Sequence, residues 1–217
     1  MKKYMKESLL WVLILIPYVY LSTIWQQLPD RVPTHFNING VADDWSGKNF
    51  LFFIPAGLGI FIYLLMLVLP YIDPKKRILQ MGEKYTSLRF MLTFFFALLS
   101  CYLLYVTKEG SIKNPNLLIA LIGILCAMFG NYFQAMRPNY FIGIRTPWTL
   151  ESETVWKKTH HLAGRLWLVG GILIAGLSFV VSNSRAMVII FISLMVVISI
   201  IPIILSYAWF KKEKSSL

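Results

Sequence analysis

Six long stretches of this 217-residue chain contain no charged side chain. They are residues 8–29, 49–72, 90–107, 114–136, 166–184 and 186–210, and each has between 18 and 25 residues. About 20 apolar residues in a helix cross a hydrocarbon core of roughly 30 Å. A helix satisfies its own backbone groups in lipid, and the alternating pattern of a membrane β-barrel is missing. The sequence therefore predicts an all-α membrane protein with six transmembrane helices.

The composition excludes other classes of protein. The chain is 57% hydrophobic and only 14% charged, whereas a soluble domain carries roughly 25% charged residues. Two cysteines are too few for a disulfide framework or a zinc module. Six spans leave no room for a soluble catalytic domain as well.

The distribution of basic residues predicts the orientation in the membrane. The N-terminal tail, residues 71–89, residues 137–165 and the C-terminal tail together hold sixteen of the 21 Lys and Arg residues. The alternate loops hold five, namely Arg31, Lys48, Lys108, Lys113 and Arg185. By the positive-inside rule, both termini are cytoplasmic, in the plasma (inner) membrane. The net charge of +11 is thus a topology signal that favours contact with anionic lipid, and direct binding of nucleic acid is not expected.

The first external loop, residues 29–48, is predicted to form a hairpin. Residues 34–38 and 41–45 flank Asn39-Gly40, which is a strong signal for a tight turn. His35 lies near Asp43 and Asp44 across this hairpin, but a closed metal site needs more converging ligands. We therefore expect no metal at His35.

The cytoplasmic loop, residues 137–165, divides into two parts. Residues 137–147 have prolines at both ends and a glycine between them, which predicts an extended or turn-like segment. Residues 149–163 then predict a short amphipathic helix, with Thr149 as its cap. Two interpretations stand for it: a helix that lies in the membrane interface, or a simple amphipathic connector between two spans. His160 and His161 point to different faces of this helix, and His160 is expected to be buried on a hydrogen bond.

The sequence contains no motif that indicates catalysis. It has no phosphate-binding glycine loop, no HExxH and no serine nucleophile motif, and the six stretches hold no Asp or Glu to relay a proton. We expect no enzyme activity, no cofactor and no metal. A small transporter or exporter of an amphipathic peptide or lipid remains an alternative, since uncharged polar groups can also line a path.

One face of the fourth stretch consists of small and uncharged polar residues. Small residues and amides recur there at three- and four-residue steps: Ala120, Gly123, Ala127, Asn131 and Gln134. Small residues let helices approach closely, and amides hydrogen-bond between helices. Two interpretations stand: a helix-packing face, or a binding groove that uses Asn131 and Gln134.

The run RPNYFIGIRTPWTL at residues 137–150 carries a family resemblance. Together with Gly130-Asn131, Glu153, Val155-Trp156, Thr159-His160 and Gly164, it resembles the signature of the SdpI family of bacterial membrane proteins. Leu28-Pro29, residues 32–35, Gly40 and Lys48 are similar to an uncharacterised domain that often precedes that signature. The resemblance implies an N-terminal two-helix unit, residues 1–72, and a four-helix unit, residues 73–217.

The resemblance also implies a function. The family's name-giving member protects the cell from a secreted, membrane-active peptide toxin made by sibling cells, and signals by holding a cytosolic transcriptional repressor at the membrane. The residues carried over in the signature loop are Asn139, Tyr140, Gly143, Arg145, Thr146, Pro147, Trp148, Thr149, Trp156, His160 and Gly164. Those in the external loop are Pro33, His35, Asn37, Gly40 and Lys48. Among these, Arg145 is the main functional candidate, because its guanidinium can reach backbone carbonyls or a lipid phosphate.

Overall fold

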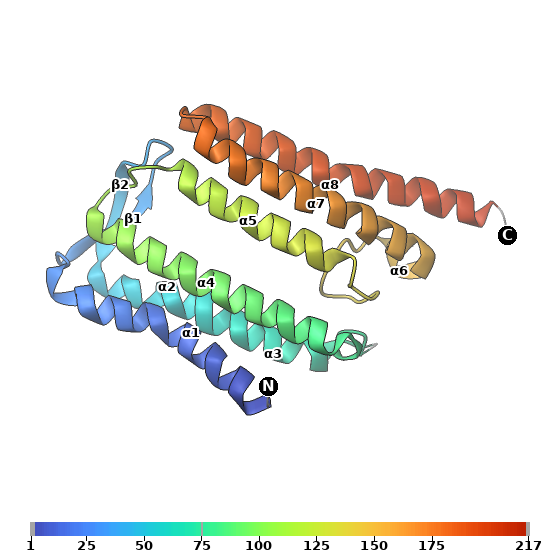
Figure 1. Cartoon of the computed structure of the whole chain (residues 1–217), viewed down its shortest axis with the longest axis horizontal. Coiled ribbons are helices and arrows are strands. Elements are labelled where there is room, and N and C mark those ends of the chain that lie inside the picture. The colour runs from blue at the N-terminus through green and yellow to red at the C-terminus, as the bar shows by residue number, and fades with distance from the viewer. Residues whose placement is uncertain (1–2, 75, 216–217) are drawn as a thin grey trace. The chain divides into compact units, whose positions relative to one another are not determined.

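The computed structural model describes residues 3–74 and 76–215, and these are mostly helical (Figure 1). Lys2 and Lys75, which contribute to the basic count above, lie outside the described residues. The long helices are α1 (Lys3–Ile24), α3 (Ile62–Ile72), α4 (Glu83–Glu109), α5 (Asn116–Phe133), α7 (Glu153–Val180) and α8 (Ser184–Lys214). Shorter elements are α2 (Phe53–Pro55), α6 (Pro147–Glu151), and the strands β1 (Arg31–Phe36) and β2 (Ala42–Gly47).

The predicted six spans are confirmed as helices of sufficient length and hydropathy. They run over Met5–Gln27, Lys48–Ile72, Glu83–Glu109, Asn116–Phe133, Glu153–Val180 and Ser184–Lys214. The second span is composite: a 3-10 turn (Lys48–Phe52), α2, a π-helical stretch (Ala56–Phe61) and α3 follow one another. Pro55 lies just before the π-helical stretch, where its missing N–H interrupts the regular ladder.

The chain forms two compact units whose limits differ from the sequence units 1–72 and 73–217. One unit comprises residues 1–68 and 86–115, and the other comprises residues 69–85 and 116–217. Most of α4 thus groups with α1 and α3, although residues 73–82 separate it from them in the sequence.

In the first unit, α1, the hairpin and α4 share an apolar core. Leu21 and Ile24 of α1 pack against three further buried residues. These are Val32 of β1, Leu51 of the 3-10 turn that opens the second span, and Leu104 of α4. β1 and β2 pair antiparallel, with irregular register on either side of His35. The core therefore anchors the hairpin to the ends of the spans.

In the second unit, α5 and α7 lie against each other through small residues. A Cβ added to Gly123 would lie 2.8 Å from the carbonyl oxygen of Gly171, and one added to Gly164 would lie 2.8 Å from that of Gly130. Real side chains do not approach a backbone so closely, so glycine permits this packing. The structure therefore supports the helix-packing interpretation of the small residues in the fourth span.

The predicted interfacial helix over residues 149–163 is corrected in its limits. Ser152 interrupts the helical segment with extended dihedral angles, so residues 147–151 form α6 and residues 153–163 are the first turns of α7. Thr146 caps α6 and Ser152 caps α7, instead of the predicted Thr149. The buried face that the pattern predicts is present, because Val155, Trp156 and Ala163 are buried. Periodicity alone does not show that the helix continues into the span.

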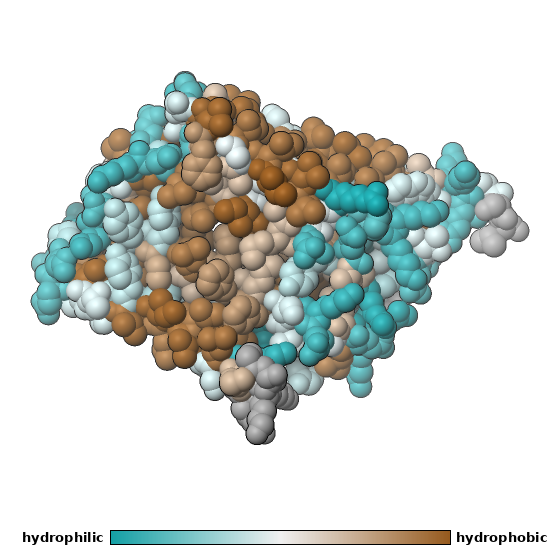
Figure 2. Space-filling model, viewed as in Figure 1, coloured by the Kyte–Doolittle hydropathy of each residue, from teal (hydrophilic) through white to brown (hydrophobic). Residues whose placement is uncertain are grey.

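Hydrophobic side chains cover the middle of the helices, and hydrophilic ones gather at the ends (Figure 2). The surface of α8 illustrates this, since Ile192, Val196 and Ile200 are about half exposed, whereas its last turns carry three lysines. Such a belt is the surface expected of a helix in contact with lipid.

Candidate functional site: the signature loop

The signature loop, residues 137–165, begins with a turn built around Asn139. The side-chain amide of Asn139 is buried, and both its NH2 group and its oxygen form hydrogen bonds. Its Nδ2 donates to the carbonyls of Arg137 (2.8 Å) and Ile142 (3.2 Å), and its Oδ1 accepts from the N–H groups of Phe141 (2.8 Å) and Ile142 (2.7 Å). An aspartate would match only the acceptor half of this pattern. Residues 137–146 are not helical, as the prolines predicted.

His160 fastens this loop to α7. It is 1% exposed, as expected from the sequence. Its Nδ1 lies 2.9 Å from the carbonyl oxygen of Trp156, and its Nε2 lies 3.0 Å from the backbone nitrogen of Ile144. The Ile144 N–H can only donate, so Nε2 is the acceptor and the proton of a neutral ring is on Nδ1.

Gly143 and Trp156 enclose the same imidazole. Gly143 has φ +105°, and a Cβ at this position would collide with His160 Nε2. On the other side the Trp156 ring stacks on His160, with centroids 3.9 Å apart, and its Nε1 donates to the Met136 carbonyl at 2.8 Å. The start and the middle of the loop are therefore both bonded to the first turns of α7.

Thr146, Pro147 and Thr149 form the turn from the loop into α6. The Thr146 Oγ1 accepts from the Thr149 N–H, and the Thr149 Oγ1 accepts from the Thr146 N–H, which makes a capping box. Pro147 occupies the first helical turn, where it needs no N–H partner. The Thr149 hydroxyl also donates to the Ile144 carbonyl at 2.9 Å, so the cap is tied to the His160 contact.

Arg145 and Tyr140 are exposed side chains next to the buried His160 contact. The Arg145 Nη1 donates to the Tyr140 carbonyl at 2.5 Å. Arg145 makes no ion pair within residues 3–74 and 76–215, and its side chain is exposed. The rest of its guanidinium therefore faces outward, with donors available to an anionic group.

Trp148 connects the loop to α8. Its Nε1 donates to the Oγ of Ser206 at 2.6 Å, and its ring meets Tyr207 edge to face, with centroids 5.2 Å apart. One turn further on, the Ser152 hydroxyl bonds the carboxylate of Glu213. No local pattern indicates Ser206 or Glu213, because both contacts join segments about 60 residues apart.

The other predicted residues of the second unit have different environments. Gly164 lies in the α5–α7 packing face, close to Gln134. Asn131 and Gln134 are both exposed, and the structure does not bring Asn131 into the signature loop.

The hairpin residues form a second, separate group. The Asn37 Oδ1 accepts from the N–H groups of Asn39 (2.9 Å) and Val41 (3.1 Å), which shapes the turn. Gly40 has φ +77°, and its carbonyl accepts from the Ile112 N–H at 2.8 Å. Lys48 pairs with Asp30 at 3.3 Å, and the Pro33 carbonyl lies 3.5 Å from the Thr107 hydroxyl.

We predict that His35 does not bind a metal. Its Nδ1 lies 2.5 Å from Asp43 Oδ1, and its side chain is two-thirds exposed. Within the described residues, no group of three or more His, Cys, Asp and Glu side chains converges. Metal analysis of the purified protein should find no stoichiometric zinc, in wild type or in His35→Ala. Zinc that is present in wild type and lost in His35→Ala would contradict this prediction.

One polar cluster was missed by the sequence analysis. Arg89 of α4 donates to the Glu7 carboxylate of α1, and the Tyr63 hydroxyl of α3 donates to the same carboxylate at 2.8 Å. Arg89 is 8% exposed. Glu7 and Arg89 each lie one residue outside an uncharged stretch, and the helices extend past those stretches, so the flanking charges become part of the span packing.

These features define a multi-pass integral membrane protein, with a folded loop bonded to the start of its fifth span. A family model described as the SdpI/YfhL protein family matches residues 135–206. A second model, a domain of unknown function (DUF1648), matches residues 12–59. The immunity protein SdpI of Bacillus subtilis (strain 168) is 30% identical over 218 residues, which cover 98% of this chain and 100% of that protein.

The chain therefore belongs to the SdpI family, as the resemblance in its signature loop predicted. The first model covers the signature loop, α6, α7 and most of α8, and the second covers most of α1 and the hairpin. No solved structure matches the chain significantly.

Proposed function

We propose that this chain is an immunity protein that protects a bacterial cell against a secreted, membrane-active peptide. The observation that carries the proposal is the 30% identity to the immunity protein SdpI of Bacillus subtilis over nearly the whole chain. The protein acts by binding, without enzyme chemistry or a cofactor. The signature loop supports a specific role, because a simple connector between spans would not need a network that uses Asn139, His160 and Thr149 completely.

In this proposal the two polar groups of residues have different tasks. The hairpin meets the peptide or the lipid that it disturbs, and it carries the exposed apolar side chains Ile38, Val41 and Trp45 for that contact. The signature loop responds on the opposite side of the membrane and presents Arg145 to lipid phosphate or to a cytosolic transcriptional repressor.

This division of tasks requires both termini to be cytoplasmic, and we predict that orientation from the sixteen-to-five asymmetry in basic residues. Reporter fusions after Lys48 and Lys113 should report an external location. Fusions after Lys84 and Lys157 should report a cytoplasmic one. A reversed location at any of the four positions would exclude this topology.

Expression in a sensitive host followed by challenge with a panel of membrane-active peptides tests the function. Cells that make the protein should survive at least one peptide that kills cells carrying the empty vector. A fluorescent form of the same peptide distinguishes binding from export, since an exporter would lower the cell-associated label and a binding protein would retain or raise it. Survival with strongly lowered label would favour the exporter.

A further inference from the structure

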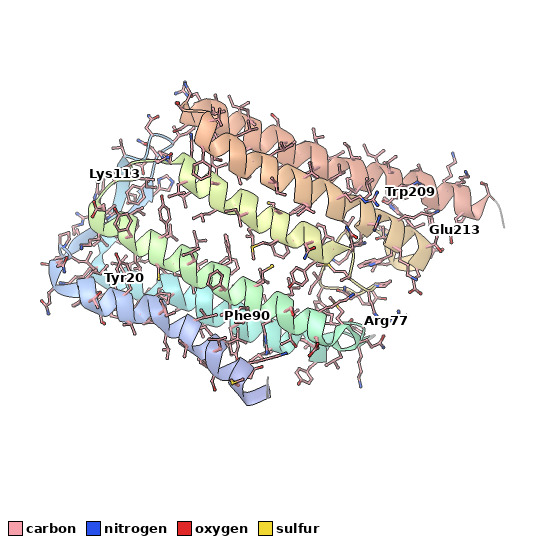
Figure 3. All side chains as sticks on the ribbon, viewed as in Figure 1. Tyr20, Arg77, Phe90, Lys113, Trp209 and Glu213 are labelled. Atoms are coloured by element: carbon pink, nitrogen blue, oxygen red, sulfur yellow. The ribbon has the colours of Figure 1, made fainter. Side chains whose placement is uncertain are left out.

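A pocket lies in the second unit between the start of α7 and the end of α8. It has a volume of about 280 Å³ and is lined by Thr154, Val155, Lys158, Trp209, Lys212 and Glu213. Figure 3 labels Trp209 and Glu213 near the C-terminal end of α8. The volume is close to the lower end of the range for small-molecule sites, roughly 300–1,000 Å³, so the pocket suits a small polar group.

Three groups of the lining are donors without an acceptor among the described residues, and the Glu213 carboxylate lies beside them. Lys158, the Thr154 hydroxyl and the Trp209 indole N–H make no hydrogen bond or ion pair with any other residue that the structure describes. Lys212 adds a second ammonium group to the same lining. Two cations and two neutral donors around one pocket are the chemistry that binds an anion with several oxygens, such as a phosphate.

The neighbouring carboxylates are already engaged. The Glu213 oxygens accept from the Ser152 hydroxyl at 3.1 and 2.8 Å. Glu151 pairs with Lys214 at 3.0 Å, and Glu153 pairs with Lys157 at 3.5 Å. The Ser152–Glu213 and Glu151–Lys214 contacts join the end of α8 to the N-cap of α7 and to α6, and they reduce the negative charge that Lys158 and Lys212 would otherwise meet. The positive end of α7 adds to the same field.

The position of the pocket selects a lipid over a free anion. The exposed apolar residues Ile203, Ile204 and Leu205 of α8 end one turn before Trp209, and the lysines begin immediately after Phe210. Tryptophan followed by lysine at the end of a span is the pattern of the membrane–water boundary, at the depth of the phosphates. A lipid phosphate is held at this depth, whereas a free phosphate has no reason to stay there.

We propose that this pocket is a binding site for the phosphate of an anionic phospholipid head group. Lys158 and Lys212 bind the phosphate from the two helices, Thr154 and Trp209 donate to its remaining oxygens, and the acyl chains run along the exposed face of α8. The site is independent of the proposed immunity function, because it requires only that α7 and α8 meet the membrane boundary here.

Lipid titration of the full-length protein in detergent tests this site. Phosphatidylglycerol, phosphatidylcholine with the same acyl chains, and inorganic phosphate are added separately, and native mass spectrometry counts the bound molecules. Wild type should retain phosphatidylglycerol about tenfold more strongly than phosphatidylcholine and should not retain phosphate. The double variant Lys158→Gln/Lys212→Gln should lose that preference, while Trp209→Phe should weaken it in part.

The matched control is Arg165→Gln/Lys211→Gln, which removes the same charge from the same two helices outside the pocket lining. It should keep the preference for phosphatidylglycerol to within about twofold. An equal loss in both double variants would reduce the effect to general surface charge and overturn the proposal. Retention of inorganic phosphate, or stronger binding of an acidic peptide than of phosphatidylglycerol at these residues, would overturn the assignment to lipid.

Discussion

Replacing Gly143 by alanine should abolish protection while the protein still accumulates in the membrane. The added Cβ would collide with His160 Nε2, and φ +105° is a conformation that alanine rarely adopts. The Ile144–His160 hydrogen bond would break, and the buried acceptor would lose its partner. Strain and the lost bond together should cost about 2–5 kcal/mol locally.

Hydrogen exchange measures this opening directly. Deuterium uptake of the peptide that contains Ile144 should be at least about tenfold faster in Gly143→Ala than in wild type. The control is Gly176→Ala on α7, where an added Cβ meets nothing within 4 Å. That variant should match wild type in uptake and in survival. Unchanged uptake in Gly143→Ala would show that the His160 contact does not hold the loop.

Arg145→Lys and Trp148→Ala should each abolish protection at equal membrane abundance. Lysine cannot reproduce the planar guanidinium that bonds the Tyr140 carbonyl while it presents further donors. Trp148→Ala removes the bond to Ser206 and the ring contact with Tyr207, and so releases α6 from α8. The loss of the charge-assisted Arg145 contact should cost about 1.5–3 kcal/mol, which is about tenfold or more in an equilibrium constant.

Lys157→Ala serves as the control for both variants. Lys157 is exposed and makes only an i,i+4 pair with Glu153, which contributes little. Survival should therefore stay at the wild-type level. If Arg145→Lys protected as well as wild type at equal abundance, residues 137–165 would be only a connector between two spans.

The spans and the non-helical loop could be predicted from the sequence because each depends on local features. Charge-free length indicates a span, and Pro138, Gly143 and Pro147 exclude a helix between them. The small residues of the fourth stretch likewise predicted close packing, which Gly123 and Gly130 confirm. Local patterns also placed His160 in the interior, since its neighbour His161 must face the other way.

The remaining contacts could not be predicted because they join distant parts of the chain. Glu7 meets Arg89 and Tyr63 across three helices, and Trp148 meets Ser206. No periodicity indicates which of many polar residues will pair at such separations. The sequence also did not show that residues 153–163 continue into α7. An amphipathic pattern indicates which face of a helix is buried, but it does not indicate where the helix ends.

Survival under peptide challenge, with the amount of membrane-inserted protein measured in the same cells, tests the central claim most directly. Four strains are compared: empty vector, wild type, Gly143→Ala and Gly176→Ala. We predict that wild type and Gly176→Ala survive a peptide that kills the vector strain, and that Gly143→Ala dies at equal protein abundance. Death of the wild-type strain across the whole panel would contradict an immunity function, and survival of Gly143→Ala at the wild-type level would contradict the role of the signature loop.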